Sequence, residues 1–295
     1  MVALNLEKTE KKFNIFLGEF LSKLTNVPTT PAISKELFSF RKKDYVLIKN
    51  NLSLPELTQN LLDDIIFEKS EILEILNEVF SNKSKFNSNF LKNLLDSNLF
   101  STIISTNYDF LFEDYFFDTI NKNTPFLLET PETDKVNFYK IFGDLNIPDK
   151  FILSTQDIKR IKILAFYEAF WKNIRNELCK NPTLLFAVNL EDTVFLDILN
   201  FIFSKIKKQH KKIYLYTNED IKSEQAKDFL ETYSVTLIKG DYEDFFKNIE
   251  IEFPELKKNS EISEKEISEK KKCDIKNSIE EIEEIKEEKE NHNLY

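Results

Sequence analysis

The stretch TIISTNYDFLFED, residues 102–114, joins a short apolar run to a polar turn and then to a second apolar run. Its first four residues are bounded by turn residues, a pattern typical of a strand buried in a parallel sheet. Asp109 stands where a helix would begin, and Glu113 and Asp114 follow within the first turn, where acidic side chains stabilise a helix. The stretch therefore predicts a strand, a turn and a helix in succession.

The same alternation of short apolar runs and helical patterns extends along most of the chain. Four more runs have the pattern of buried parallel strands, at residues 14–17, 183–188, 213–217 and 235–239. Helical patterns occupy residues 109–121, 156–179, 193–208 and 223–232. Strands that alternate with helices form βαβ units, so we predict an α/β fold, a Rossmann-like parallel sheet with helices on both faces. A further pair of strands is expected at residues 126–128 and 137–141.

Residues 34–98 interrupt this alternation. They show no strand-like period of two. Their apolar side chains instead recur at the spacing of one helix face, as at Leu57, Leu61, Leu62, Ile65 and Ile66. We therefore predict a helical insertion after the first strand.

The composition changes sharply toward the C-terminal end. Residues 257–295 are almost entirely Lys, Glu, Ser, Asn and Ile, with too little apolar surface to offset the entropy lost on ordering. Ile275, Ile279 and Ile282 share one helical stripe, so a solitary helix is the alternative to disorder. We predict a globular domain over residues 1–256, followed by a charged tail that is disordered or a single helix.

Charge and cysteine content narrow the functional classes. A net charge of −10 opposes general nucleic-acid binding, and the basic run at residues 205–212 is interpreted as a solvated helix end. Cys179 and Cys273 lie far apart in the sequence. We therefore expect no zinc site, no other metal site and no disulfide framework. With no long apolar segment and no signal-peptide pattern, we expect a cytoplasmic protein without membrane contact.

Polar residues cluster where the predicted strands end. Gly18 and Ser22 follow the first strand, residues 105–109 close the central one, and residues 189–192 follow a later one. A loop at residues 140–144 lies downstream of the central strand. In open α/β sheets ligands bind outside the carboxyl ends of the strands, so a binding site is expected where these segments meet.

Taken in order, these segments resemble the sirtuin-like family of NAD-processing proteins, in its bacterial defence-associated branch. That branch is typified by a G-A-G-x-S turn, a helical insertion, a strand ending T-T-N-Y-D, a K-x-H-G element and a strand ending G-x-S-x-x-D. The clearest counterpart is IISTNYDFLFED at residues 103–114, with Lys140-Ile141-Phe142-Gly143 downstream of it. The resemblance extends over residues 13–246.

The resemblance implies an NAD-binding cleft and assigns residues to it. The implied cofactor-binding positions are Gly18, Ser22, Thr106, Asn107, Asp109, Gly143, Asn189 and Asp192. Asn107 is the implied catalytic residue, which would orient the attacking water or contact the nicotinamide ribose. The residues alone favour structural roles, with Asp109 and Ser22 as helix caps and Asn107 as the residue that closes a turn.

Three of the family's motifs are altered. Phe20 replaces the second glycine of the first turn, where a benzyl group would occupy ligand space, and Glu19 beside it would repel a pyrophosphate. Phe142 replaces the histidine, and phenylalanine cannot accept a proton. Ala187 and Asn189 replace the glycine and serine of the last motif. We therefore expect NAD binding to be weak or absent.

These departures leave three hypotheses open. The favoured one is a degenerate sirtuin-like domain, a pseudoenzyme that serves as a scaffold or interaction protein through an unidentified protein partner or self-association. The second is a residual NAD glycohydrolase of the antiphage type, which uses Asn107 with Glu19 or Asp144 as substitute base. The third is a binding module for another nucleotide-like ligand. A zinc-dependent protein deacylase is the least expected enzyme, because the family's zinc-binding cysteines and histidine are missing.

Overall fold

The computed structural model describes residues 13–40, 52–64, 67–81, 86–132 and 134–247. Residues 8–243 make up a first compact unit of the chain, distinct from the terminal segments. The sheet and its helices belong to the first unit. The predicted domain boundary at residue 256 and the predicted tail lie outside the described residues.

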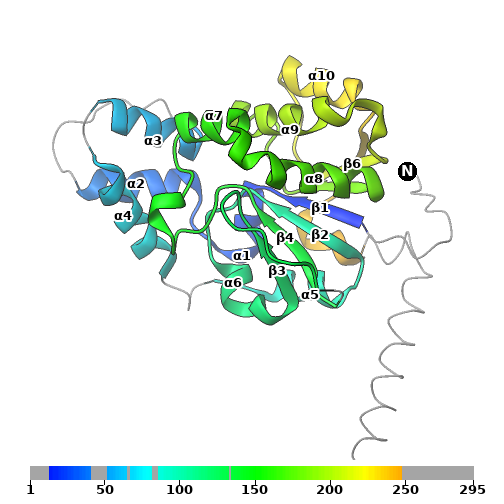
Figure 1. The fold of residues 1–295 in the computed structure, drawn as a ribbon, viewed down its shortest axis with the longest axis horizontal. Coiled ribbons are helices and arrows are strands. Elements are labelled where there is room, and N and C mark those ends of the chain that lie inside the picture. The colour runs from blue at the N-terminus through cyan, green and yellow to red at the C-terminus, as the bar shows by residue number, and fades with distance from the viewer. Residues whose placement is uncertain (1–12, 41–51, 65–66, 82–85, 133, 248–295) are drawn as a thin grey trace, which may run out of the picture. The chain divides into compact units, whose positions relative to one another are not determined.

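The described residues form a seven-stranded parallel sheet in the order β3-β4-β2-β1-β5-β6-β7 (Figure 1). The strands are β1 (Phe13–Leu17), β2 (Phe100–Ser105), β3 (Ile120–Asn123), β4 (Val136–Lys140), β5 (Thr183–Phe186), β6 (Ile213–Thr217) and β7 (Thr236–Lys239). The five strands expected from short apolar runs are present, and β1 lies at the centre between β2 and β5. The predicted α/β, Rossmann-like sheet is confirmed.

Helices lie on both sides of this sheet, and Figure 1 shows α8 and α9 on one side and α5 and α6 on the other. The helices outside the predicted insertion are α1 (Ser22–Thr25), α6 (Leu111–Phe116), α7 (Thr155–Ile163), α8 (Glu168–Lys180), α9 (Thr193–Ile206) and α10 (Glu224–Thr232). The insertion contains α2 (Thr30–Phe40), α3 (Leu54–Asp63), α4 (Lys69–Ser81) and α5 (Asn89–Asp96). None of the described helices combines the length and apolar content that a membrane span requires.

The apolar runs form central strands because side chains on both faces of the sheet are buried. Phe16, Ile104 and Leu185 lie in the large core that also contains the apolar side chains of α8 and α9. On the opposite face, Phe90 of α5 stacks on Phe186 with 5.1 Å between ring centroids. Burial of this kind stabilises the fold by about 25 cal/mol per Å² of apolar surface removed from water.

The helical insertion has an apolar core that also includes residues of the Rossmann-like domain. Leu57 and Leu61, two of the residues whose spacing predicted a helix, are buried in it, whereas Ile65 and Ile66 lie outside the described residues. Two residues of the segment before α7, Phe151 and Leu153, belong to the same cluster. The hydroxyl of Thr58 donates a hydrogen bond to the carbonyl of Leu153 at 2.6 Å. The insertion is therefore fixed against the segment that follows β4.

One predicted strand, at residues 126–128, is wrong. These residues form the turn after β3. Strand β3 itself, rather than residues 126–128, pairs with β4. The predicted helix over residues 109–121 therefore stops early, because α6 ends at Phe116 and β3 begins at Ile120. No apolar run marks β3, whose sequence is INKN. Its buried amides are instead satisfied by the backbone, since Asn121 donates to the carbonyl of Glu132 and Asn123 to that of Asn121.

Two further elements differ from their predictions. The helix predicted over residues 156–179 is broken after Ile163, because Leu164 is extended, with φ −78° and ψ 127°. Trp171 of α8 donates its indole N–H to the carbonyl of Ile161 at 2.6 Å and so joins the two pieces. Strand β7 is only half-buried, because it lies at the edge of the sheet and its side chains alternate between partly buried and exposed.

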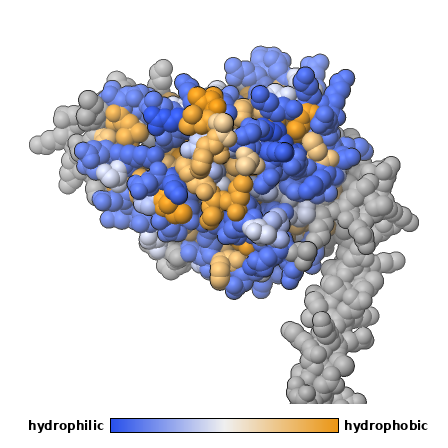
Figure 2. Space-filling view, in the orientation of Figure 1, coloured by the Kyte–Doolittle hydropathy of each residue, from blue (hydrophilic) through white to orange (hydrophobic). Residues whose placement is uncertain are grey.

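A group of apolar side chains lies at the surface rather than in the core. Figure 2 shows a band of apolar residues among polar ones on this face of the molecule. Exposed apolar side chains come from the α7–α8 connection and from the loops after β3 and β4. We name them the apolar patch: Ile163, Leu164, Phe166, Leu127, Leu128 and Ile147. The rings of Phe126 and Tyr167, 5.2 Å apart, connect two of these segments.

Candidate functional site

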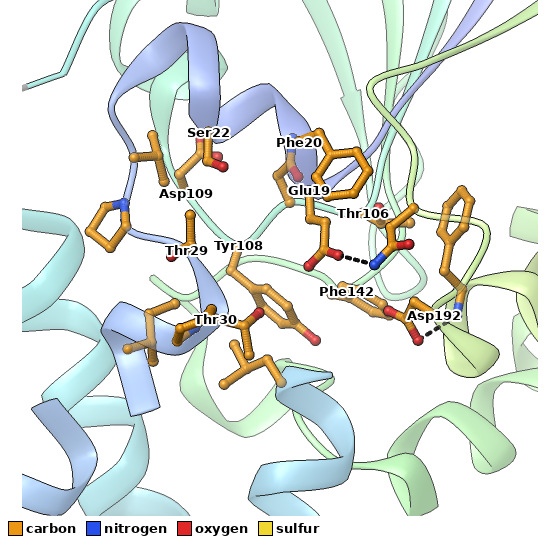
Figure 3. Close-up of a pocket in the computed structure, with 18 of the residues that line it drawn as sticks. Glu19, Phe20, Ser22, Thr29, Thr30, Thr106, Tyr108, Asp109, Phe142 and Asp192 are labelled. Atoms are coloured by element: carbon orange, nitrogen blue, oxygen red, sulfur yellow. Dashed lines mark hydrogen bonds between the residues drawn. The ribbon is translucent and has the colours of Figure 1, made fainter. Parts of the chain in front are cut away.

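The strand register brings three loops to one edge of the sheet. Leu17, the last residue of β1, pairs with Ser105 of β2 and with Phe186 of β5, so the three strands end side by side. The loops that follow them, together with residues of α2, α3 and α9, line a cavity of about 330 Å³, here named the cleft (Figure 3). This is the edge of the sheet at which α/β proteins bind ligands.

Most of the predicted site residues meet in the cleft. Those that line it are Ser22, Thr106, Asn107, Asp109, Asn189 and Asp192. Glu19, Phe20 and Phe142, where the chain departs from the family pattern, line it as well. Gly18 and Gly143 are not among the lining residues.

These two glycines have backbone roles. A Cβ atom on Gly18 would lie 2.5 Å from the Cα of Val188, so glycine allows the loop after β1 to pass against the loop after β5. Gly143 has a φ of +82°, which side chains of the L configuration rarely adopt. Both positions therefore shape the loops around the cleft without contributing side chains to it.

Ala187, at the position where the family pattern has glycine, adopts a backbone conformation that glycine favours. Its φ is +54°, in the left-handed region. This orientation lets its carbonyl accept a hydrogen bond from the backbone N–H of Phe20 at 2.9 Å, while the N–H of Gly18 donates to the carbonyl of Phe186 at 3.1 Å. The N–H groups of Gly18 and Phe20 are thus bonded to protein carbonyls.

The ring of Phe20 forms a wall of the cleft and does not fill it. It packs near Tyr242, with 6.4 Å between ring centroids, and the ammonium of Lys23 lies 4.5 Å from its centroid. The same ring lines a second cavity, of about 170 Å³, on the other side of the loop after β5. The predicted loss of ligand space at this position is therefore partial.

Glu19 and Asn189 join the first and third loops across the cleft. The side-chain amide of Asn189 donates a hydrogen bond to the carboxylate of Glu19 at 2.6 Å, the contact drawn in Figure 3. The sequence predicted each residue as a departure from the family pattern but not their contact. Glu19 is thus held with its negative charge at the cleft.

Phe142 occupies the position of the family's histidine and packs as an aromatic residue. It is buried and stacks on Tyr108 with 4.8 Å between centroids and 14° between ring planes. His210 lies elsewhere, exposed at the start of the connection to β6 and in ring contact with Phe203 and Tyr233. His292 is outside the described residues.

Tyr108 is a cleft residue that the sequence analysis missed. Its hydroxyl is buried and has no hydrogen-bond partner among the described residues. Burial, followed by the nearby charges of Asp192, Asp157 and Glu19, raises the pKa of this phenol well above its usual value. Its position between Asn107 and Asp109 was the available signal, since consecutive residues of this turn, from Thr106 to Asp109, line the cleft.

Asn107 and Asp109 belong to a turn that is fixed from behind. The carboxylate of Asp109 accepts a hydrogen bond from the N–H of Leu111 at 2.9 Å, as expected of a residue that precedes a helix. Burial raises the pKa of Asp109, and the ammonium of Lys140 opposes this rise. Lys140 is itself buried and donates to the backbone carbonyl of Asp109 and to Glu113. Asn107 directs its side chain to the cleft wall.

Asp192 caps helix α9 and faces the cleft. Its carboxylate accepts hydrogen bonds from the N–H groups of Val194 at 2.8 Å and Phe195 at 3.3 Å. Burial, together with the nearby charges of Glu19 and Glu56, raises the pKa of Asp192 to about 6, although its backbone hydrogen bonds act in the opposite direction. The cleft therefore contains a carboxyl group that titrates near neutral pH.

Asp144, one of the two predicted substitute bases, is not a lining residue of the cleft. It forms an ion pair with Lys122, which lowers the pKa of Asp144 despite its partial burial. Among the described residues no group of three or more His, Cys, Asp and Glu side chains is arranged to hold a metal ion. Cys179 is a free thiol, and Cys273 lies outside the described residues.

The comparison with protein families agrees with the resemblance read from the motifs. No curated protein matches the chain. The model of the SIR2-like domain matches residues 101–238, which include strands β2 to β6, the Asn107–Asp109 turn, Phe142 and Asp192. Over residues 101–238 the chain is therefore similar to the SIR2-like domain family, which supports the resemblance to sirtuin-like proteins.

Proposed function

We propose that this protein is a sirtuin-like pseudoenzyme, a scaffold whose NAD cleft no longer supports cleavage. The observation that carries the proposal is the closed first turn. A pyrophosphate binds to free N–H groups of a glycine-rich turn at a helix N-terminus. Here the N–H groups of Gly18 and Phe20 donate instead to the carbonyls of Phe186 and Ala187. The residues present therefore do not fit the dinucleotide.

The charge of the cleft supports the same proposal. Glu19 and Asp192 are carboxylates that line it, and a pyrophosphate carries negative charge of its own. Lys23, the lysine among the lining residues, is in an ion pair with Glu219 at 2.6 Å. At partly buried sites like charges a few ångströms apart repel by several kcal/mol at most, which is enough to weaken binding by orders of magnitude.

The proton chemistry also supports an inactive site. The family's histidine acts as a base or contacts the ribose, and Phe142 can do neither. The Phe142 ring is held by its stack on Tyr108. Asn107 therefore lines the cleft without the imidazole that would accompany it in an active relative.

Calorimetry with NAD and an assay of nicotinamide release test the proposal. We expect a Kd weaker than about 1 mM and no release above the rate without protein. Asn107→Ala should change neither result. Micromolar NAD binding, or nicotinamide release that Asn107→Ala abolishes, would contradict the proposal.

A residual NAD glycohydrolase is the second candidate, and Asp192 is the observation that favours it. A carboxyl group with a pKa of about 6 can accept a proton near neutral pH, and it shares the cleft with Asn107. NAD depletion during phage infection, the role implied by the resemblance to the defence-associated branch, belongs to this candidate. Nicotinamide release that rises with pH through about 6 and is lost in Asp192→Asn would support it.

The scaffold role requires a surface that a partner covers, and we propose that the apolar patch is covered by a second copy of this chain. Contiguous apolar surface is often an interaction site. Charges of both signs border the patch, with Lys150 and Lys162 beside Asp149 and Asp197, so a two-fold symmetric pair can match opposite charges around an apolar centre.

Sedimentation equilibrium tests this pairing. We expect the parent protein to form dimers at tens of micromolar and Phe166→Ser to shift it to monomers, because Phe166 is 72% exposed within the patch. Phe117→Ser is the matched control, since Phe117 is 69% exposed outside the patch, and it should leave the dimer unchanged. A parent protein that stays monomeric throughout this range would overturn the pairing.

A further inference from the structure

The cleft has an uncompensated negative charge. Glu19 and Asp192 reach it from the loops after β1 and β5, so the two carboxylates come from different elements. The carboxylate of Asp109 differs from these two in lying near the Lys140 ammonium, which acts to lower its pKa. In Figure 3 the carboxylates of Glu19 and Asp192 and the hydroxyl of Tyr108 surround the ring of Phe142.

Aromatic rings form one side of the same space. Tyr108 and Phe142 are stacked nearly parallel, and the face of an aromatic ring attracts a cation. The hydroxyl of Tyr108 has no hydrogen-bond partner among the described residues, although it is buried. A buried hydroxyl without a partner is costly in free energy, and a ligand that bonds to it would remove this cost.

The size of the cleft limits what can enter it. Its volume of about 330 Å³ lies at the lower end of the range for ligand pockets. Apolar side chains from the insertion and the segment before it, including Val27, Ile33 and Leu54, also line the cleft. A suitable ligand is therefore compact, with one polar, charged end and an apolar body.

We propose that the cleft binds a compact organic cation, with its charged nitrogen between Glu19 and Asp192 and its apolar body against Tyr108 and Phe142. The proposal rests on the proposed function, because a cleft that excludes an anionic dinucleotide is free for a ligand of opposite charge. The two carboxylates repel each other when the cleft is empty. A cation between them is attracted to both, and this attraction outweighs their mutual repulsion.

Proton NMR titration with two probes of equal shape tests the proposal. Phenethylamine is a cation at pH 7, and 2-phenylethanol is its neutral counterpart. We expect the amine to bind at least about tenfold more tightly than the alcohol. Glu19→Gln and Asp192→Asn should each remove most of this preference and leave binding of the alcohol unchanged. Glu191→Gln is the matched control, because Glu191 lies in the same loop as Asp192 but does not line the cleft.

The affinity for the amine should rise with pH through about 6, because the cation binds the ionised form of Asp192. The other groups that face Asp192 are Glu19, Glu56 and the phenol of Tyr108, together with the N–H groups that begin α9. In Asp192→Asn this rise should disappear. A cooperative unfolding transition with a midpoint no lower than that of the parent confirms that each variant is folded.

Equal binding of the two probes, or a preference that Glu191→Gln abolishes, would overturn the cation site. NAD titrated into the same samples separates this failure from failure of the proposed function. If neither NAD nor the amine binds, only the cation site is wrong. If NAD binds at micromolar concentration and the amine shows no preference, both proposals are wrong.

Discussion

Ala187 adopts a φ of +54° and offers its carbonyl to the N–H of Phe20. The left-handed conformation costs an L-residue about 1–2 kcal/mol. Its methyl group is fully buried, and burial of one such group returns about 0.8 kcal/mol. The cost of keeping a glycine-like turn without glycine is therefore offset only in part. The first turn remains closed by packing and hydrogen bonds inside the protein.

Restoring the family's residues one at a time tests this view of the cleft. Phe142→His alone should give no NAD cleavage, because the N–H groups of Gly18 and Phe20 stay bonded to protein carbonyls. Glu19→Ala combined with Phe20→Gly should restore NAD binding first, because it removes the carboxylate that repels the pyrophosphate and gives the first turn the backbone freedom to release its N–H groups. Adding Phe142→His should then permit slow hydrolysis that depends on Asn107. Calorimetry and nicotinamide release measure the two steps, and hydrolysis by the single Phe142→His variant would show that the turn is not the barrier.

At the scale of elements, helix α9 begins at a carboxyl group that the fold holds in an unfavourable environment. Burial raises the pKa of Asp192 from 3.8 to about 6. Because the folded state favours the protonated form, the stability contributed by this group is complete below pH 4 and is lost as pH rises through about 6. Such a cost at a cleft residue is typical of a site that is arranged for a ligand rather than for stability.

Asp192→Asn should therefore stabilise the protein at pH 7 by about 1–2 kcal/mol and have little effect at pH 4. Asparagine caps a helix about as well as aspartate and carries no charge. Urea unfolding of parent and variant at both pH values measures the difference. A stability difference that does not change between pH 4 and pH 7 would show that Asp192 keeps an ordinary pKa.

The end of β4 is joined to α6 and β3 by an ion-pair network. Lys140, whose side chain is 1% exposed, contacts Glu113 at 2.6 Å, and Lys122 contacts the same carboxylate at 3.1 Å. Lys140 also holds the backbone of the Asn107–Asp109 turn through the carbonyl of Asp109. The lysine of the K-x-x-G element thus supports the cleft from behind, although it does not line it.

Lys140→Met should lower the free energy of unfolding by about 3–5 kcal/mol, because it leaves buried acceptors without their partner. Lys227→Met is the matched control. Lys227 pairs with Glu224 on the exposed face of α10, where an ion pair contributes at most about 0.5 kcal/mol. Urea unfolding compares the two variants, and equal losses would show that the network of Lys140 is not important for stability.

At the scale of the whole molecule, the apolar core and the insertion core are formed by residues well before the charged tail. Deleting residues 257–295 should leave the thermal midpoint within roughly 3 °C of the parent value, since the tail sequence has little apolar surface to bury. Calorimetric unfolding of both proteins measures this. A large drop in the midpoint after truncation would move the domain boundary beyond residue 256.

Much of the fold and of the site was predictable from local patterns. Short apolar runs predicted the strands that lie inside the sheet, because a strand buried on both faces must be apolar along its length. Strand β3 was not predicted, because two of its buried side chains, Asn121 and Asn123, are polar. Asn121 donates a hydrogen bond to the carbonyl of Glu132 in the loop that follows, and Asn123 donates to the carbonyl of Asn121 within the strand. The polar residues after three strands predicted the cleft because parallel strands end at one edge.

What the chain pattern leaves open is how those residues face one another. The contact between Glu19 and Asn189 joins residues 170 positions apart, and the stack of Phe142 on Tyr108 depends on how two loops pack. Phe20 could fill the cleft or line it, and packing near Tyr242 places it in the wall. Residue type and spacing specify which chemistry is present. Distances, burial and charge in the cleft arise only when distant segments pack together, because those quantities belong to pairs of residues rather than to single positions.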